Sequence, residues 1–236
     1  MTKLLNIEQG SDDWNQFRGN LVTGTSLKDV LSSDDTRQTK SNKMLASLCG
    51  VYRPVDIKSA AMDFGNDNEE LALEYFNNQN NLFAQPLGMM VSEDIKLFGV
   101  SPDAVIYECE FACDKVIGGV EIKNPSPHVH FKYINDGGIP DEYFCQVLSM
   151  FLVNDDVEFW YFMSFCPELV GTDYEHLAKH QVLILKEDLD NLIKSYYAKK
   201  RKNKYESYEE VKEKLIEFTN DANEKFESIK QNVKGE

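Results

Sequence analysis

The order of its elements predicts that this chain forms a mixed α/β fold, with helices flanking a central mixed sheet. Helical patterns come first, a cluster of strand-like runs follows, and a helix, further strands and a helical tail complete the chain. The 236 residues are 42% hydrophobic and 28% charged, a composition typical of globular proteins. With neither an internal repeat nor a linker, we expect one domain over 1–236, with its core at about 8–185 and a helical extension at about 186–236.

The first helix is predicted to begin at Ser11 or Asp12, because both residue types are favoured at helix N-caps. Trp14, Phe17 and Arg18 then fall on one face, at the spacing i, i+3, i+4. A short run of hydroxyl residues and glycine follows and is predicted to end this helix.

Further helices are predicted before the strands begin. The turn at 23–26 caps a short helix at 27–31, the polar segment 34–43 is predicted to be a loop, and 44–48 is predicted to be a short apolar helix. A longer helix is predicted at 60–77, since a run of asparagines follows it and favours a stop.

The middle of the chain has the residue pattern typical of β-strands, with short runs of β-branched and aromatic residues separated by glycine, proline and polar residues. Strands are predicted at 95–100, 104–107, 116–123, 157–165 and 181–185. A helix is predicted at 140–153, between the third and the fourth of these strands. The tail is predicted to be helical, and beyond a basic stretch at 199–204 its apolar residues recur every three or four positions. That spacing predicts a C-terminal amphipathic helix, packed on the body or on a neighbouring subunit.

The charge of the chain restricts how it meets nucleic acid. Asp and Glu total 40 against 25 Lys and Arg, which gives a net charge of −15 and a pI near 4.7. This balance argues against non-specific coating of nucleic acid, although it leaves room for a local basic groove. No apolar run is long enough to span a bilayer, and the first 20 residues lack a signal pattern. We therefore expect a cytoplasmic protein with no membrane association.

An acidic and basic cluster is predicted at the ends of two neighbouring strands. Glu121 and Lys123 point to one face of their strand while Val120 and Ile122 point to the other, because side chains alternate along a strand. Asp103 ends the preceding strand region and is expected to join them. Two carboxylates can hold a hard divalent cation, and a lysine can position or deprotonate water and stabilise charge on a phosphate. The plainer interpretation is a solvated Glu–Lys pair on an edge strand.

A third carboxylate is predicted on the helix at 60–77. Glu69 shares a helical face with Ala72, Leu73 and Phe76, which is the side expected to face the core. An acid on that face is costly to bury unless it is paired or bound to a cation. Glu70 lies nearer the polar edge. The alternative for Glu69 is an acid favoured near a helix start by the macrodipole.

Together these pieces resemble the core of the PD-(D/E)xK nucleases, and more narrowly the lambda-exonuclease type (YqaJ-like) of phage recombination nuclease. The resemblance covers about 8–185, and it is specific as a combination although each piece alone is weak. The motifs that carry it are Gln9-Gly10-xxx-Trp14-xxx-Arg18, Thr23-Gly24-Thr25-Ser26, Gly65-xxx-Glu69-xx-Ala72, Ser101-Pro102-Asp103, Glu121-Ile122-Lys123 and Tyr143-xx-Gln146.

The resemblance implies a metal site on the described strands. It assigns metal ligation to Asp103, Glu121, Glu69 and the carbonyl of Ile122, with Lys123 as the catalytic lysine. The cofactor it implies is Mg²⁺, replaceable by Mn²⁺, with two ions per site.

The same resemblance assigns residues outside the metal site. Gln146 is implied to reach the metal site or the scissile phosphate, and its alternative is a polar residue on a packed helix. Arg18, Thr25 and Ser101 are implied to bind a terminal 5′ phosphate, and Tyr143 joins them as a substrate-binding residue. Ser26 competes with Thr25 for that role, and Arg18 read alone is a surface charge.

What the resemblance implies for function is 5′-to-3′ digestion of linear double-stranded DNA in phage-type recombination. The implied partners are DNA ends with a 5′ phosphate, two further copies of the chain in a ring-shaped homotrimer, and a single-strand annealing protein. A ring reconciles the net charge of −15 with DNA binding, because only its channel needs to be basic. The alternatives are an endonuclease on the same core and a non-catalytic DNA-binding or scaffold module.

Overall fold

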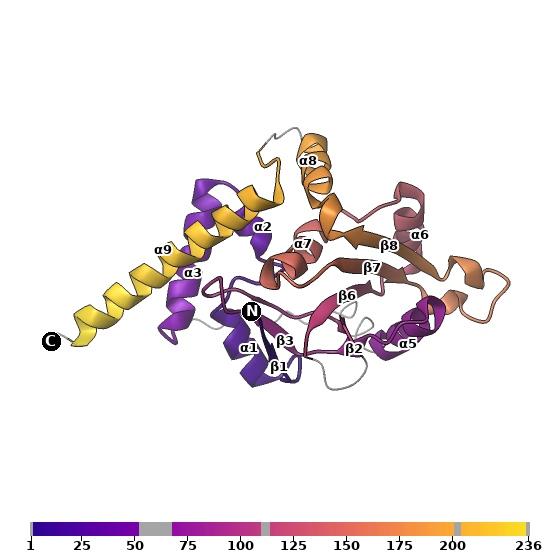
Figure 1. The fold of residues 1–236 in the computed structure, drawn as a ribbon, viewed down its shortest axis with the longest axis horizontal. Coiled ribbons are helices and arrows are strands. Elements are labelled where there is room, and N and C mark those ends of the chain that lie inside the picture. Colours follow the sequence, from indigo (N-terminus) through magenta and orange to yellow (C-terminus); the bar gives the residue numbers. More distant parts are fainter. Residues whose placement is uncertain (1, 52–67, 110–113, 201–203, 235–236) are drawn as a thin grey trace.

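In the computed structural model, which describes residues 2–51, 68–109, 114–200 and 204–234, two sheets form the centre of the molecule (Figure 1). The smaller sheet has the order β1-β3-β4 and contains β1 (Thr2–Leu5), β3 (Met89–Ser92) and β4 (Gly99–Val100). The larger sheet has the order β2-β5-β6-β7-β8 and contains β2 (Gln85–Pro86), β5 (Ala104–Tyr107), β6 (Val116–Lys123), β7 (Phe159–Phe165) and β8 (Lys179–Leu185).

The larger sheet is mixed, as the sequence predicts. Strands β6 and β7 are parallel, with Glu121 beside Phe162 and Lys123 beside Ser164. The other pairs in this sheet are antiparallel. A parallel pair requires a long crossover, and here the chain makes it through two helices.

Eight α-helices belong to the described part of the chain: α1 (Asp12–Gly19), α2 (Leu27–Val30), α3 (Asp34–Leu48), α5 (Glu69–Asn80), α6 (Pro127–Asp136), α7 (Phe144–Val153), α8 (Leu189–Lys199) and α9 (Tyr208–Lys234). Short 3₁₀ helices lie at Pro167–Leu169, Glu175–Leu177 and Lys186–Asp188. None of the described helices is long and apolar enough to cross a membrane.

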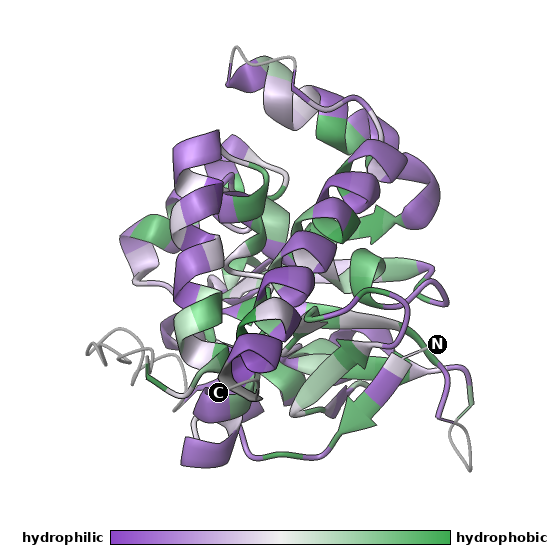
Figure 2. Cartoon of the chain, turned by 90° about the vertical axis from the view of Figure 1, so that its left-hand side faces the viewer, coloured by the Kyte–Doolittle hydropathy of each residue, from purple (hydrophilic) through white to green (hydrophobic). Residues whose placement is uncertain are grey.

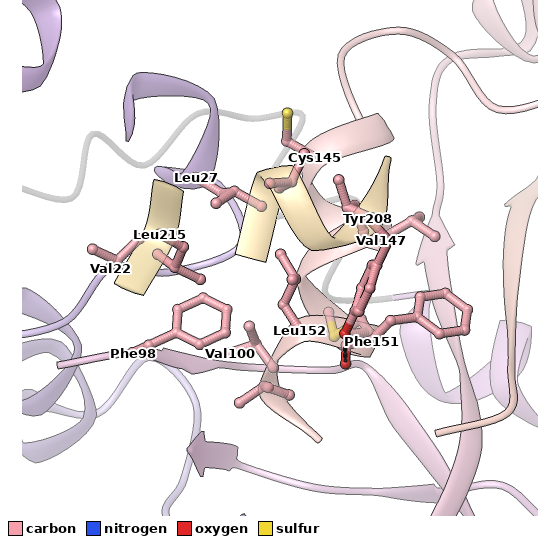
Figure 3. Packing of buried hydrophobic residues seen from close by; sticks show 14 of the residues in the cluster. Val22, Leu27, Phe98, Val100, Cys145, Val147, Phe151, Leu152, Tyr208 and Leu215 are labelled. Atoms are coloured by element: carbon pink, nitrogen blue, oxygen red, sulfur yellow. Dashed lines mark hydrogen bonds between the residues drawn. The ribbon is translucent and has the colours of Figure 1, made fainter. Parts of the chain in front are cut away.

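Helices cover both faces of the larger sheet. On one face Val120 and Ile122 pack in a cluster with Ala72 and Phe76 of α5. The other face, which includes Phe162, belongs to the main core with α7. Figure 3 shows part of that core, where the labelled side chains of α7 meet those of α2, β4 and α9. Because side chains alternate along β6, Val120 and Ile122 point toward α5, whereas Glu121 and Lys123 point toward α7.

Helix α9 is amphipathic, as predicted, and its first half completes the main core. Val211, Leu215 and Ala222 are fully buried, and the hydroxyl of Tyr208 donates a 2.9 Å hydrogen bond to the Phe151 carbonyl (Figure 3). The outward face of the helix is hydrophilic (Figure 2). Toward the C-terminus the helix extends beyond the body (Figure 1), and Ile229 is exposed.

The prediction of a loop at 34–43 is wrong, because α3 begins at Asp34 and continues without a break to Leu48. Its first turn is acidic, which suits the positive end of the helix dipole. Its buried residues are Ser41 and Met44, so the helix has almost no apolar stripe of its own. Contacts with α9, far along the chain, stabilise it instead.

Other boundaries also differ from the prediction. Most of the strand predicted at 95–100 is a turn in which Leu97 has a φ of 53°, and only β4 remains extended. Helix α7 begins at Phe144 rather than near 140. The predicted helix at 60–77 corresponds to α5 from Glu69 onward, and its earlier part lies outside the described residues. Strands β1, β2 and β3 and helix α6 were not predicted.

Candidate active site

The centre of the site is Glu121, a fully buried carboxylate on β6 facing α7. Its Oε1 atom forms an ion pair with Lys123 and accepts a hydrogen bond from Nε2 of Gln146. These three residues therefore lie together, as predicted. Alternation along β6 places Glu121 and Lys123 on one face, and the first turn of α7 brings Gln146 over them.

Asp103 joins this group from the start of β5. Its Oδ2 atom accepts a 2.6 Å hydrogen bond from the backbone N–H of Ile122, and Nζ of Lys123 lies 3.9 Å from the same oxygen. Its side chain is 17% exposed, so it is held at the edge of the buried region. The antiparallel pairing of β5 with β6, which sets Ala104 beside Val120, positions Asp103 against Ile122.

Glu69 lies at the start of α5, close enough to influence the cluster electrostatically. Glu69 is half-buried while its neighbour Glu70 is exposed, which agrees with the helical register predicted from the sequence. Burial raises the pKa of Glu69 to about 7, with Asp103 adding to the rise and Lys123 opposing it.

Burial is the largest cause of the pKa shifts in the cluster. Burial, followed by repulsion from Asp103, raises the pKa of Glu121 to about 8, against the opposing effect of Lys123. Burial also raises the pKa of Asp103, although Lys123 and the Ile122 N–H oppose it. Burial alone would lower the pKa of Lys123, but Glu121 and Asp103 outweigh it and the net shift is upward. The single ammonium group of Lys123 thus interacts with three acidic side chains, those of Glu69, Asp103 and Glu121.

This donor set fits a divalent cation. Oε2 of Glu121 is buried and has no hydrogen-bond partner among the described residues. A buried acceptor without a partner is costly, and a hard cation with oxygen ligands would satisfy it. In the described ranges no three His, Cys, Asp or Glu side chains already converge as metal ligands. The fit is therefore to two carboxylates, Asp103 and Glu121, with Glu69 nearby.

Tyr143 borders the cluster at the N-terminal end of α7. Its ring lies 5.5 Å from that of Phe162 in a stacked arrangement, and Nζ of Lys123 lies 5.4 Å from the Tyr143 ring centroid. The ring thereby forms a wall beside the lysine.

Arg18 and Thr25 form a second candidate site. A guanidinium nitrogen of Arg18 donates a 3.1 Å hydrogen bond to Oγ1 of Thr25, and the guanidinium lies 4.5 Å from the ring centroid of Trp14. Ser26 instead accepts a 2.9 Å hydrogen bond from the N–H of Thr23, so it stabilises the turn. Of the two competing hydroxyls, Thr25 is the one beside Arg18.

Ser101 is linked to this second site through Trp14. The indole Nε1 donates a 3.0 Å hydrogen bond to the Ser101 hydroxyl, so that Ser101 orients the ring on which Arg18 lies. Ser101 also precedes Asp103 by two residues. It therefore lies between the second site and the carboxylate cluster.

Gly24 is a residue whose role the sequence did not reveal. A Cβ at Gly24 would lie 2.7 Å from Oγ of Ser149 and 3.3 Å from Cγ of Gln146. The turn that carries Thr25 therefore rests directly on the helix that supplies Gln146. A glycine between two hydroxyl residues suggested only a turn, and the contact depends on a helix more than 100 residues away.

A mixed sheet with an Asp–Glu–Lys cluster, centred on the buried Glu121 under one flanking helix, defines an α/β protein with a candidate hydrolytic centre. The model of the YqaJ-like viral recombinase domain matches residues 13–156, which is more than half of the chain. The chain belongs to the YqaJ-like viral recombinase family, which confirms the YqaJ-like resemblance noted from its motifs.

Solved structures show the same fold. The crystal structure of an alkaline exonuclease from Laribacter hongkongensis is similar with a TM-score of 0.71 and 19% identity, covering 95% of this chain and 99% of that one. The structure of the same enzyme in complex with dAMP gives a TM-score of 0.69, with the same identity and coverage. These similarities confirm the α/β architecture with flanking helices. No curated protein matches the chain.

Proposed function

We propose that this protein is a metal-dependent exonuclease that digests linear double-stranded DNA from its 5′ ends during viral-type recombination. Family membership and fold support the coarser class, a nuclease of the recombinase type. The observation that carries the finer proposal is the buried carboxylate of Glu121, whose Oε2 lacks a hydrogen-bond partner among the described residues. It lies in a cluster with Asp103 and Lys123.

The proposed cofactor is Mg²⁺, for which Mn²⁺ would substitute, with two ions per site. Asp103 and Glu121 would hold the ions, with Glu69 and the Ile122 carbonyl as further ligands. When bound, such ions lower the pKa of a coordinated water and neutralise charge on a phosphate. Oxygen ligands of this kind are the ones that Mg²⁺ prefers.

The chain's own residues prepare the site for this chemistry. Lys123 and Gln146 both bind Oε1 of Glu121, which fixes that carboxylate and leaves Oε2 without a hydrogen-bond partner among the described residues. The Ile122 N–H fixes Asp103 in the same way. The ammonium group of Lys123 lies beside both Glu121 and Asp103, where it would stabilise charge that develops on the reacting phosphate.

The proposed substrate end is held by Arg18 and Thr25. A guanidinium beside a hydroxyl suits a terminal phosphate, because both donate hydrogen bonds and the guanidinium supplies charge. Ser101 orients this group through Trp14, and Tyr143 borders the site where the reacting phosphate would lie. The related exonuclease is described in complex with dAMP, a 5′-mononucleotide of the kind that such a reaction would release.

The proposed assembly is a ring of three chains that works with a single-strand annealing protein in the cytoplasm of the host cell. A net charge of −15 requires that DNA contacts be confined to a small part of the surface. A central channel meets that requirement.

The test is a digestion assay with purified protein. Its substrates are linear duplex DNA with 5′ phosphate, the same DNA with 5′ hydroxyl, and a closed circle, each in Mg²⁺ and in EDTA. We expect digestion of linear DNA alone, faster with the 5′ phosphate, and none in EDTA. Cleavage of the circle would favour an endonuclease. Binding without cleavage in either metal would favour a scaffold protein.

A further inference from the structure

A small polar pocket extends the second site toward α3. Its volume is about 290 Å³, and Arg18 and Thr25 line it together with residues of α2 and α3. Lys40 and Lys43 of α3 and Asp29 of α2 are among the residues that line it. The segment that contains Lys40 looked like a polar loop in the sequence, and only the helix directs Lys40 toward Arg18.

The charges that line this pocket are unbalanced. Among the described lining residues, the cations Arg18, Lys40 and Lys43 face a single carboxylate, that of Asp29. Two hydroxyl groups, those of Thr23 and Thr25, lie 3.1 Å apart at its wall. A compact group of cations with hydroxyl donors is complementary to an anion that carries two charges and several acceptor oxygens, as a terminal phosphate does.

Lys40 is held in the pocket at an energetic cost. It is half-buried, and within the described structure its ammonium group makes one hydrogen bond, of 3.4 Å, to the Leu21 carbonyl. Burial lowers the pKa of Lys40 to about 8; Arg18 and Lys43 add to the decrease, while Asp29 opposes it. An ammonium has three donors, so Lys40 retains donors for a ligand.

We infer that Lys40 is a specificity-determining residue that binds the 5′-terminal phosphate of DNA together with Arg18 and Thr25. The inference rests on the proposed function and adds a residue from a different helix to the site. Lys40 contacts the phosphate only when the strand end is seated in the pocket. It therefore distinguishes a phosphorylated end from a hydroxyl end and takes no part in bond cleavage.

The first test measures binding without catalysis. Amine acylation of the full-length protein at neutral pH, in EDTA, is followed at individual lysines by mass spectrometry, with Lys194 as the exposed reference. The added ligands are inorganic phosphate, 5′-phosphorylated duplex and 5′-hydroxyl duplex. We expect the phosphorylated duplex to slow acylation of Lys40 several-fold relative to Lys194, and the hydroxyl duplex to leave it unchanged. Protection by inorganic phosphate alone would show a free-anion site and overturn the assignment to DNA ends.

The second test compares variants in the digestion assay. Lys40→Met should lower the ratio of the rates on 5′-phosphate and 5′-hydroxyl ends by about tenfold, the size expected for one charge-assisted hydrogen bond. Lys40→Arg should recover part of the ratio, whereas Lys194→Met, which changes the charge equally, should leave it intact. A normal ratio in a folded Lys40→Met protein would overturn the inference.

The two tests separate this inference from the proposed function. If the wild-type protein cuts no DNA but Lys40 is protected by phosphorylated ends, the nuclease proposal fails and the role of Lys40 stands. If the wild-type protein cuts 5′-phosphorylated ends faster, but phosphorylated duplex does not protect Lys40 and Lys40→Met leaves the rate ratio unchanged, the role of Lys40 fails alone. Equal protection of Lys40 by both duplexes would overturn its role in end discrimination.

Discussion

Asp103 is held against the backbone of Ile122 by a 2.6 Å hydrogen bond that an asparagine could also accept. Asp103→Asn should therefore fold normally and yet lose the charge needed to hold a cation. We expect the rate of Mg²⁺-dependent DNA digestion to fall by a factor on the order of 10² or more, as for the loss of one preorganised electrostatic contact.

Glu108→Gln is the matched control for this variant, because it also neutralises one acid but lies exposed near the end of the same hairpin. Its rate should equal that of the wild type, and circular dichroism should show both variants folded. A folded Asp103→Asn protein with near-wild-type activity would show that the site is misassigned.

Glu69 and Glu70 provide a second comparison at the residue scale. They are adjacent in sequence, but Glu69 is half-buried beside the cluster and Glu70 is exposed. Glu69→Gln should lower the metal-dependent rate, and raise the Mg²⁺ concentration needed for half-maximal activity, while Glu70→Gln should change neither. Equal effects of the two substitutions would remove Glu69 from the proposed ligand set.

The sequence predicted the carboxylate cluster more completely than the pocket beside it. Alternation along one strand is enough to place Glu121 and Lys123 together, and a turn between two strands is enough to bring Asp103 to them. Lys40 was missed for the opposite reason: its position depends on a helix that local residue preferences do not predict. The same holds for the contact of Gly24 with α7, which requires the tertiary fold.

At the scale of elements, predictions held where an element has its own apolar pattern. Strands β6, β7 and β8 and helix α9 carry such patterns, and their existence and type were predicted. Helix α3 and strands β1 and β3 depend on partners distant in the sequence. Helix α6 was missed although Ser126 precedes a proline in its first turn and Gly137 follows it, both of which are helix boundary signals.

The two halves of α9 should respond differently to the loss of apolar side chains. Leu215 is fully buried in the main core, whereas Ile229 is 40% exposed near the C-terminal end. Leu215→Ala should lower the free energy of unfolding by about 2–5 kcal/mol, because it leaves a cavity. Ile229→Ala should lower it by less than about 1 kcal/mol. Urea denaturation of the two variants measures the difference, and comparable losses would show that the distal half is also packed.

At the scale of the whole molecule, the proposed ring of three chains can be tested by its mass. The chain has a mass of 27.1 kDa. At micromolar concentration, analytical ultracentrifugation should give the proposed ring a mass three times that value. Adding DNA ends should leave the number of chains unchanged, because the ring forms before the substrate enters it. A species of one chain mass under these conditions would contradict the ring, and a single subunit would then have to hold the duplex.

The close packing of Gly24 against Gln146 has a consequence for the length of strand that such a nuclease would remove at each cut. With no side chain between them, the turn that carries Thr25 and the helix that carries Gln146 are separated by a fixed interval. In the proposed nuclease, the turn would capture the strand end and the helix would reach the reacting phosphate. The interval belongs to the protein and is the same for every substrate sequence. Each cut would then remove an equal length of strand, and the enzyme would advance along DNA in uniform strides.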